Sequence, residues 1–429
     1  MRTIINPPPD TWKSLCERPS FDNKELEDIV RNILDRVKNE GDRALYEYTE
    51  KFDGVSPKSI RVAQEEIRES GKLVTEILKN AIKTAKVNIG KFHSAQPGRE
   101  EVIETSEGVR CWRKSVPIEK VGLYIPGGTA PLFSTVLMLA VPAKIAGCSE
   151  ITLCTPPDRE GKVNPLILYT ASLSGVTNVF RIGGAQAIAA MAFGTKSIPK
   201  VDKIFGPGNQ YVTKAKELVQ LYGTPIDIPA GPSEVLVIAD ETADPEFIAA
   251  DLLSQAEHGT DSQVVFLTNN SELLSDVRRE MDKQIMLLPR KEIALESMNN
   301  SHIILFSTLD QCTEFSNLYA PEHLIIVTAN PHLLAEKILN AGSVFLGKYS
   351  CESAGDYASG TNHTLPTNGY ARSFSGVSTD SFMKKITFQE ITAEGLKNIG
   401  PAIELLAEAE FLEGHKNAVT VRLNTLKNV

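Results

Sequence analysis

The fold is decided by residues 121–147, which read VGLYIPGGTAPLFSTVLMLAVPAKIAG. The opening run, Val121–Tyr124, is short and apolar, as is typical of a buried strand. A Pro-Gly-Gly turn follows it, and the apolar segment 132–146 then predicts a helix that ends at Gly147. A strand, a glycine turn and a helix in this order form the first half of a parallel βαβ unit.

The same alternation of strands and helices continues through residue 346. We expect further strands at 151–155, 179–182 and 203–205, with helices at 166–173, 185–193 and 210–221. A second series is expected to place strands at 234–240, 264–268, 302–306, 324–327 and 344–346, with helices at 245–258 and 331–341. Such alternation indicates parallel sheets with helices on both faces, so the prediction is an α/β fold with two α/β units.

Two segments outside these units are predicted to be helical. Apolar residues within 23–52 repeat at helical spacing, and Gly41 divides this segment into two helices, the second capped by Asp42. The tail from Thr387 through Leu412 shows helical periodicity as well. Neither segment contains a local motif that indicates chemistry, so both are interpreted as scaffold or arm.

Residues 352–366, which read ESAGDYASGTNHTLP, are predicted to form a loop. The segment is too rich in Gly, Ser and Asn for a helix or a central strand. It carries a carboxylate, Asp356, and an imidazole, His363, seven residues apart. Loops held by a rigid scaffold often carry binding and catalytic groups, although a surface turn with a solvated Asp and His is the alternative.

Composition excludes several classes of protein. The 429 residues are 42% hydrophobic and 23% charged, as in globular proteins that are not membrane-embedded. The net charge of −9, without a basic run, argues against nucleic acid and anionic membranes as partners. No signal peptide opens the chain, and no apolar run is long enough to span a membrane. The six cysteines show no CxxC spacing, so we expect reduced thiols and a cytoplasmic location.

Glycine turns follow several of the predicted strands. Tyr124 ends the strand at 121–124, Gly183–Gln186 follows the strand at 179–182, and Gly206–Asn209 follows the strand at 203–205. Helix N-termini behind such turns suit phosphate groups, and open α/β sheets bind ligands at the carboxyl ends of their strands. However, Tyr211 occupies the third glycine position of a GxGxxG motif, so the pattern leaves a nucleotide site and ordinary α/β turns both open.

A second group of residues has the composition of a metal site. Gln255 and His258 lie three residues apart near the end of a predicted helix and therefore share a face. Together with Asp356 and His415 they would offer the nitrogen and oxygen ligands that suit zinc. No local pattern shows that these four residues meet, and a histidine in a last helical turn often interacts only with the helix dipole.

An acid–base pair, Glu322 and His323, opens a predicted apolar strand. Histidine titrates near neutral pH, and burial can raise the pKa of a glutamate toward the same range. Such a pair can serve as general bases in catalysis. Taken alone, the pattern is also typical of a solvated strand start.

Seven segments together resemble histidinol dehydrogenase, in matching order from about residue 23 to about residue 425. They are VGLYIPGGTAPLFSTV at 121–136, IFGPGN at 204–209, PAGPSEVLVIA at 229–239, DLLSQAEHG at 251–259, PEHL at 321–324, ESAGDYASGTNH at 352–363 and HKNAV at 415–419. The resemblance implies oxidation of L-histidinol to the aldehyde and then to L-histidine. Members use two NAD and one zinc ion per subunit for these final steps of histidine biosynthesis.

The resemblance also implies a fold and an assembly. The fold would be similar to that of aldehyde dehydrogenases, with two incomplete Rossmann-like domains, helical N- and C-terminal arms and a domain-swapped homodimer with shared active sites. An N-terminal arm would cover 1–22, a discontinuous first domain 23–123 and 233–377, an NAD-side domain 124–232, and a C-terminal arm 378–429. The apolar residues of the tail would then cover a surface of the partner subunit, since an isolated helix is marginal in water.

The site residues carried over by resemblance fall on matching positions of this chain. The zinc ligands would be Gln255, His258, Asp356 and His415, and the catalytic pair would be Glu322 and His323. The NAD contacts would be Tyr124, Gln186 and Asn209, and the substrate contacts would add Ser233 and Glu410 to the zinc ligands and His323. His363 lies in a matching motif and receives no role beyond shaping the site.

Two rival functions stay open. One is oxidation of another small alcohol, such as a sulfonated diol, although Glu410 and His415 argue against it. The other is a zinc hydrolase in which Glu322 activates a metal-bound water without nicotinamide. A non-catalytic binding module would leave the acid–base pair without a purpose.

Overall fold

The computed structural model describes residues 1–18, 24–98, 100–127, 131–229 and 231–427. Part of the first glycine turn (128–130) and part of the predicted N-terminal arm (19–22) lie outside the described residues. The chain divides into two compact units, Met1–Gln96 with Ile118–Phe382 and Pro97–Pro117 with Met383–Val429. Among the described residues, no helix is long and apolar enough to cross a membrane.

The first unit contains a six-stranded parallel sheet with the strand order β1-β10-β9-β8-β11-β12. Its strands are β1 (Arg2–Ile5), β8 (Glu234–Ala239), β9 (Gln263–Thr268), β10 (His302–Leu305), β11 (His323–Val327) and β12 (Ser343–Leu346). Its helices are α1 (Trp12–Leu15), α10 (Pro245–Ala256), α11 (Ser271–Ile285), α12 (Lys291–Ser297), α13 (Leu309–Tyr319), α14 (Pro331–Ala335) and α15 (Glu352–Tyr357).

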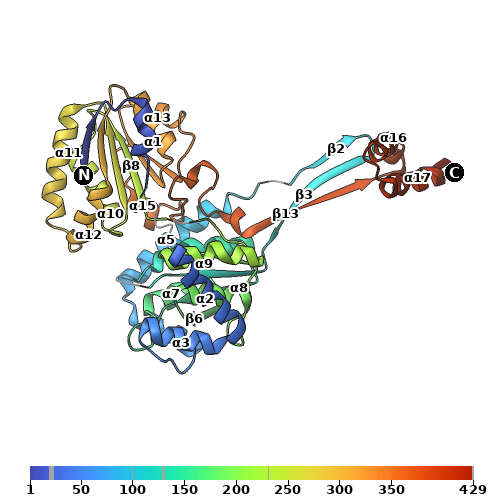
Figure 1. Ribbon diagram of the computed structural model, residues 1–429, viewed down its shortest axis with the longest axis horizontal. Coiled ribbons are helices and arrows are strands. Elements are labelled where there is room, and N and C mark those ends of the chain that lie inside the picture. Colours follow the sequence, from blue (N-terminus) through green and yellow to red (C-terminus); the bar gives the residue numbers. More distant parts are fainter. Residues whose placement is uncertain (19–23, 99, 128–130, 230, 428–429) are drawn as a thin grey trace. The chain divides into compact units, whose positions relative to one another are not determined.

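Helices cover both faces of this sheet, as Figure 1 shows for α10 to α12 on one side and α1 and α13 on the other. Successive side chains of a strand point to opposite faces. Val235 and Val237 of β8 therefore pack with α10 and α11, whereas Leu236 and Ile238 pack with α1 and α13. Burial on both faces explains why the strand sequences are apolar throughout rather than alternating.

A four-stranded parallel sheet in the same unit has the order β6-β5-β4-β7. Its strands are β4 (Lys120–Tyr124), β5 (Glu150–Thr155), β6 (Asn178–Arg181) and β7 (Lys203–Phe205). The helices around it are α2 (Lys24–Glu40), α3 (Asp42–Asp53), α4 (Gln64–Ser70), α5 (Glu76–Ser94), α6 (Phe133–Ala146), α7 (Pro165–Ser174), α8 (Gly184–Phe193) and α9 (Gln210–Val219). The strands and helices predicted for this region are thus confirmed within a few residues.

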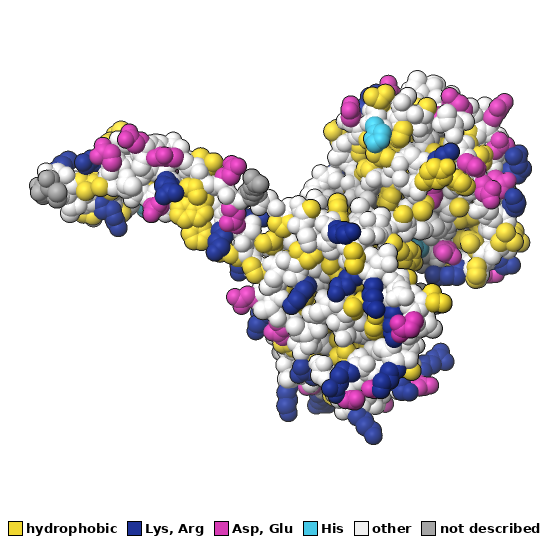
Figure 2. Space-filling model, turned by 180° about the vertical axis from the view of Figure 1, so that it is seen from behind, with side chains coloured by type: hydrophobic (Ala, Val, Ile, Leu, Met, Phe, Trp, Pro, Cys, Tyr) yellow, Lys and Arg dark blue, Asp and Glu magenta, His cyan; other side chains and the backbone are white. Residues whose placement is uncertain are grey.

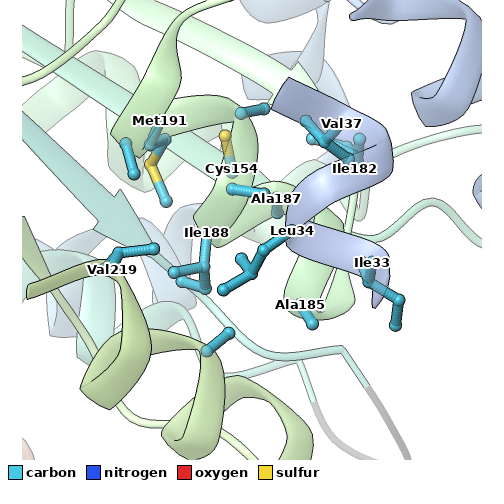
Figure 3. Close-up of a cluster of buried hydrophobic side chains, with 14 of the residues drawn as sticks. Ile33, Leu34, Val37, Cys154, Ile182, Ala185, Ala187, Ile188, Met191 and Val219 are labelled. Carbon is cyan, nitrogen blue, oxygen red and sulfur yellow. The ribbon is translucent and has the colours of Figure 1, made fainter. Parts of the chain in front are cut away.

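The N-terminal helices pack on this second sheet. Leu34 and Val37 of α2 contact the cluster that contains Ala187 and Ile188 of α8 and Val219 of α9 (Figure 3). This packing differs from the predicted grouping of 23–123 with 233–377. The periodicity of α2 identifies its buried face, but it does not show which sheet that face will cover.

The second unit is an antiparallel ribbon followed by two helices. The order is β13-β3-β2, with β2 (Val102–Ser106), β3 (Val109–Pro117), β13 (Met383–Ile391), α16 (Ala393–Ala409) and α17 (Glu413–Lys427). The prediction of helix from Thr387 was therefore wrong for Thr387–Ile391. These residues pair with β3, a partner far away in the sequence, and such a partner is invisible to local periodicity.

Two local predictions also need correction. The segment predicted to be a loop begins with helix α15, so Glu352 and Asp356 lie on a helix and only the residues after Tyr357 form the loop. Asp42 does not cap α3, because its carboxylate accepts hydrogen bonds from the backbone and hydroxyl of Ser197. Gly147 ends α6 as expected, with a φ of 94° that suits glycine.

Candidate functional site

The predicted acid–base pair lies at the amino end of β11, in the middle of the six-stranded sheet. His323 is the first residue of β11 and aligns with Val235 of β8, so Glu322 lies beside Glu234. Glu322 and His323 are 6% and 3% exposed. They are therefore at the amino edge of their sheet, opposite to the carboxyl edge where open α/β sheets usually bind ligands.

The main chain of Glu234 holds both members of the pair. Its N–H donates to Glu322 Oε2 at 2.8 Å, and its carbonyl oxygen lies 3.0 Å from His323 Nδ1. A carbonyl oxygen can only accept a hydrogen bond, so Nδ1 must carry a proton. The other ring nitrogen, Nε2, is thereby left as the atom of His323 that can gain or lose a proton in a reaction.

His323 Nε2 points to Asp356 on α15. Nε2 and Asp356 Oδ1 are 3.6 Å apart, and both atoms are buried without a hydrogen-bond partner among the described residues. Glu352, one turn earlier on α15, places Oε1 3.8 Å from His323 Nδ1. Glu322 Oε2 is 3.7 Å from the same nitrogen. One imidazole is therefore surrounded by three carboxylates.

Burial and mutual contact shift the pKa of each group in this cluster. Burial raises the pKa of Glu322 to about 8 and that of Glu352 well above its usual value. Burial opposes charge on His323, but the three carboxylates raise its pKa well above the ordinary range. Burial acts against the Asp356 carboxylate as well, yet contact with His323 holds the pKa of Asp356 below its usual value.

Gln255, in the last turn of α10, is completely buried beside this cluster. In the amide orientation that satisfies both ends, its nitrogen donates to Glu352 Oε1 and its oxygen accepts from Glu234 N at 3.1 Å. His258 follows two residues after α10, and burial lowers its pKa, which favours the neutral form that binds metals. The end of α10 therefore brings Gln255 and His258 to the same edge of the sheet as the acid–base pair.

The donor set fits a divalent metal ion. The ligand atoms of His323, Glu352 and Asp356 all lie within 4.8 Å of one another. Buried carboxylates in excess of one imidazole leave negative charge that a cation would neutralise. The atoms without hydrogen-bond partners, Nε2 of His323 and Oδ1 of Asp356, are of the types that zinc accepts.

A cleft of about 740 Å³ adjoins His258 and contains two more of the predicted residues, Asn209 and Ser233. Asn209 caps α9, with its side chain accepting from Tyr211 N at 3.1 Å and Val212 N at 3.2 Å. The turn before it requires glycine at Gly206, which has a φ of 123° and where a Cβ would lie 2.1 Å from the carbonyl oxygen of Tyr124.

The other predicted NAD contacts lie at the carboxyl edge of the four-stranded sheet. The Tyr124 hydroxyl accepts from Gly184 N at 3.0 Å, so β4 and the start of α8 are tied together. Gln186 is 1% exposed, and its Oε1 has no hydrogen-bond partner among the described residues. A buried amide oxygen without a partner is suited to accept a hydrogen bond from a ligand.

The predicted residues divide between the two units. Gln255, His258, Glu322, His323 and Asp356 gather in the first unit. Glu410, which follows α16, and His415, in α17, belong to the second. His363 supports the cluster, since its Nδ1 donates to the carbonyl oxygen of Asp356 at 2.9 Å and its Nε2 lies 3.2 Å from Thr135 Oγ1.

Sequence reasoning missed two residues of this site, Glu234 and Glu352. Glu234 acts through its main chain, which no residue type reveals. Glu352 opened a segment that was interpreted as a loop, and its only signal was a carboxylate four residues before Asp356, one helical turn away.

Comparisons with known proteins agree on one family. The sequence model of histidinol dehydrogenase matches residues 16–423. A curated histidinol dehydrogenase of Bacteroides thetaiotaomicron is 59% identical over 427 residues, which cover 100% of both chains. The crystal structure of histidinol dehydrogenase from Elizabethkingia anophelis superimposes with a TM-score of 0.98 at 58% identity, covering 100% of this chain and 99% of that chain.

A more distant structure shows the fold alone. The crystal structure of betaine aldehyde dehydrogenase from Staphylococcus aureus has a TM-score of 0.50 at 12% identity and covers 86% of this chain and 84% of that chain. The predicted likeness to the aldehyde dehydrogenase fold is thereby confirmed.

Proposed function

The chain belongs to the histidinol dehydrogenase family of NAD-dependent oxidoreductases, and we propose that it oxidises L-histidinol to L-histidine through L-histidinaldehyde. The observation that carries this proposal is the buried pair Glu322 and His323, both hydrogen-bonded to the main chain of Glu234. A four-electron oxidation needs a base for the alcohol and an activated water for the aldehyde, and the pair offers one group for each task.

His323 is assigned the removal of the hydroxyl proton. Its Nδ1–H is committed to Glu234 O, so the proton is taken at Nε2, by the neutral form of the ring, which carries no proton on that atom. Asp356, 3.6 Å from Nε2, stabilises the imidazolium that results. Bound NAD would accept the hydride in each of the two oxidations.

Glu322 is assigned the activation of water that adds to the aldehyde. Burial raises its pKa to about 8, which places it near the operating pH, where a general base is most effective. Its Oε2 accepts from Glu234 N, and this hydrogen bond ties the carboxylate to the first residue of β8. The hydrated aldehyde then loses a second hydride and gives the acid.

Zinc is proposed to be held by Gln255, His258, Asp356 and His415, one ion per subunit. When bound, the ion would hold the imidazole and amine of the substrate in one pose. A second donor set, His323, Glu352 and Asp356, is geometrically compact. We favour the first set because a metal on His323 would occupy Nε2, the only nitrogen of that ring left to act as a base.

The contacts to NAD and to the substrate are proposed from residues outside the acid–base cluster. Tyr124, Gln186 and Asn209 are proposed to bind NAD, supported by the unpartnered amide oxygen of Gln186. Ser233 and Glu410 are proposed to contact the substrate. Ser233 supports this assignment by lining the cleft next to His258.

The second unit is proposed to dock on a second copy of the chain. Its surface mixes charged and hydrophobic side chains (Figure 2), and Phe411 is 91% exposed while Leu405 and Leu406 are each 68% exposed. Apolar side chains exposed together indicate an interaction surface. Each active site would then combine the acid–base pair of one subunit with Glu410 and His415 of its partner.

A cytoplasmic location is proposed on the support of six free cysteines.

Product stoichiometry tests the reaction. Wild-type protein with zinc should form two NADH for each L-histidinol consumed. Glu322→Gln should form close to one and release the aldehyde, since only the second oxidation needs activated water. NADH absorbance and chromatography of the products measure both. A full yield of two in Glu322→Gln would contradict the role of Glu322, and no NADH from wild type would favour the hydrolase alternative.

Zinc content tests the choice between the two donor sets. His258→Ala and Asp356→Asn should lose the ion, whereas His323→Gln should retain about one zinc per chain because its ring is not a ligand. Elemental analysis after dialysis measures the content, with His302→Gln as a control far from the cluster. Zinc loss in His323→Gln with retention in His258→Ala would reverse the assignment.

Complementation tests the shared site. His323→Ala and His415→Ala should each be nearly inactive. If sites are shared in a two-fold dimer, a mixed dimer has one intact site and one doubly damaged site. An equimolar refolded mixture should therefore recover about a quarter of wild-type activity, because half of the dimers are mixed and half of their sites are intact. A mixture that stays inactive, although mixed dimers are present and zinc-loaded, would place His415 in its own chain's site.

A further inference from the structure

The side-chain carboxylate of Glu234 is held by hydrogen bonds of its own. Arg18 donates to both carboxylate oxygens, from Nε to Oε1 at 3.0 Å and from Nη2 to Oε2 at 3.0 Å. Asn368 N donates to Oε1 at 2.8 Å. The side chains of Arg18 and Glu234 are 7% and 1% exposed, so this two-pronged ion pair is shielded from water. A paired guanidinium and carboxylate in this geometry fix each other's orientation as well as charge.

Arg18 is itself immobilised on the far side of the pair. Its guanidinium lies 3.7 Å from the centroid of the Tyr319 ring and donates to the carbonyl oxygens of Tyr319 and Cys16 at 2.7 and 3.0 Å. The Tyr319 hydroxyl donates to Gln263 Oε1 at 2.6 Å, which joins α13 to β9. The position of Arg18 is thus set by two elements of the sheet layer, and not by a flexible surface contact.

The N-terminal segment carries Arg18 to this place. β1 adds parallel to β10 at the edge of the six-stranded sheet, and Trp12 packs edge-on against Phe306 and Phe315. The segment therefore runs along the α1 and α13 face of the sheet and delivers a guanidinium to the amino end of β8. No other described residue forms an ion pair with Glu234.

We propose that Arg18 is a positioning residue for the acid–base pair, acting through Glu234; the inference rests on the proposed function of Glu322 and His323. Arg18 donates to neither of them. It holds the Glu234 carboxylate and thereby the main chain of Glu234, whose N–H donates to Glu322 and whose carbonyl oxygen accepts from His323. A shift of the Glu234 main chain would displace both groups at once.

The expected effect is confined to turnover. In zinc-loaded full-length protein, Arg18→Lys and Arg18→Met should lower kcat for L-histidinol by about 10- to 100-fold, since small displacements of catalytic groups have effects of this size. The KM for NAD should stay within about twofold of wild type, because Tyr124 in β4 and Asn209 at the start of α9 belong to the layer of the four-stranded sheet. Lysine keeps the charge but not the planar fork, so Arg18→Lys should recover only part of the loss.

A double-mutant cycle with Glu234→Gln separates positioning from general stabilisation. If Arg18 acts through Glu234, the double variant Arg18→Met with Glu234→Gln should be no slower than the slower single variant. Arg278→Ala is the matched control, because Arg278 of α11 also holds the N-terminal segment, donating to Thr3 Oγ1 at 2.9 Å, but does not contact Glu234. It should keep wild-type kcat.

Three results would overturn the inference: kcat of both Arg18 variants within about twofold of wild type, multiplicative losses in the cycle, or an equal loss in Arg278→Ala. A second readout is needed if Arg18→Met does not fold. It is also needed if wild type does not oxidise histidinol, a result that would contradict the proposed function and not the role of Arg18. The ¹⁵N resonance of His323 Nδ1 should shift in Arg18→Lys and not in Arg278→Ala. An unchanged resonance in Arg18→Lys would overturn the inference without any activity assay.

Discussion

The main chain of Glu234 is the constraint on which the site depends. β8 and β11 are parallel neighbours in the middle of a sheet covered by helices on both faces, so the amino end of β8 cannot move without disturbing the core. Glu322 and His323 form hydrogen bonds with the main chain of Glu234. Because this main chain is held in the sheet, the two side chains are held in place as well. The bond from His323 Nδ1 to the Glu234 carbonyl oxygen also decides which imidazole nitrogen is free. The main chain of Glu234 therefore fixes both the positions of Glu322 and His323 and the tautomer of the His323 ring.

This arrangement brings several ionisable groups together in a buried site. Three carboxylates surround His323 in a region with little solvent, and burial alone would make their shared ionisation costly. Protons and a bound cation are the two ways of compensating such a cluster. The raised pKa of Glu322 and of His323 reflects the first way, and the proposed zinc ion would provide the second. A site of this kind is thus prepared both to bind metal and to move protons.

Local signals were sufficient for most of the α/β core. The runs 121–124 and 235–239 are apolar, and each has glycine and proline within a few residues of one end, so composition and turn residues locate them. Local motifs pointed to Glu322, His323, Gln255 and Asp356 as candidate site residues, and the structure brings these four together. Glu234 and Arg18 were not identified, because one acts through its backbone and the other through a partner 216 residues away. The strand Met383–Ile391 was missed for the same reason, since its pairing is with β3.

The most direct measurement is ¹⁵N NMR of zinc-loaded protein with labelled histidines, with His323 assigned through its loss in His323→Gln. Because the Glu234 carbonyl oxygen accepts from Nδ1 of His323, we expect Nδ1 to remain protonated at every pH at which the protein is folded. Any titration of this ring should appear at Nε2. An unprotonated Nδ1, with the proton on Nε2 instead, would show that Glu234 does not hold the imidazole and would contradict the account.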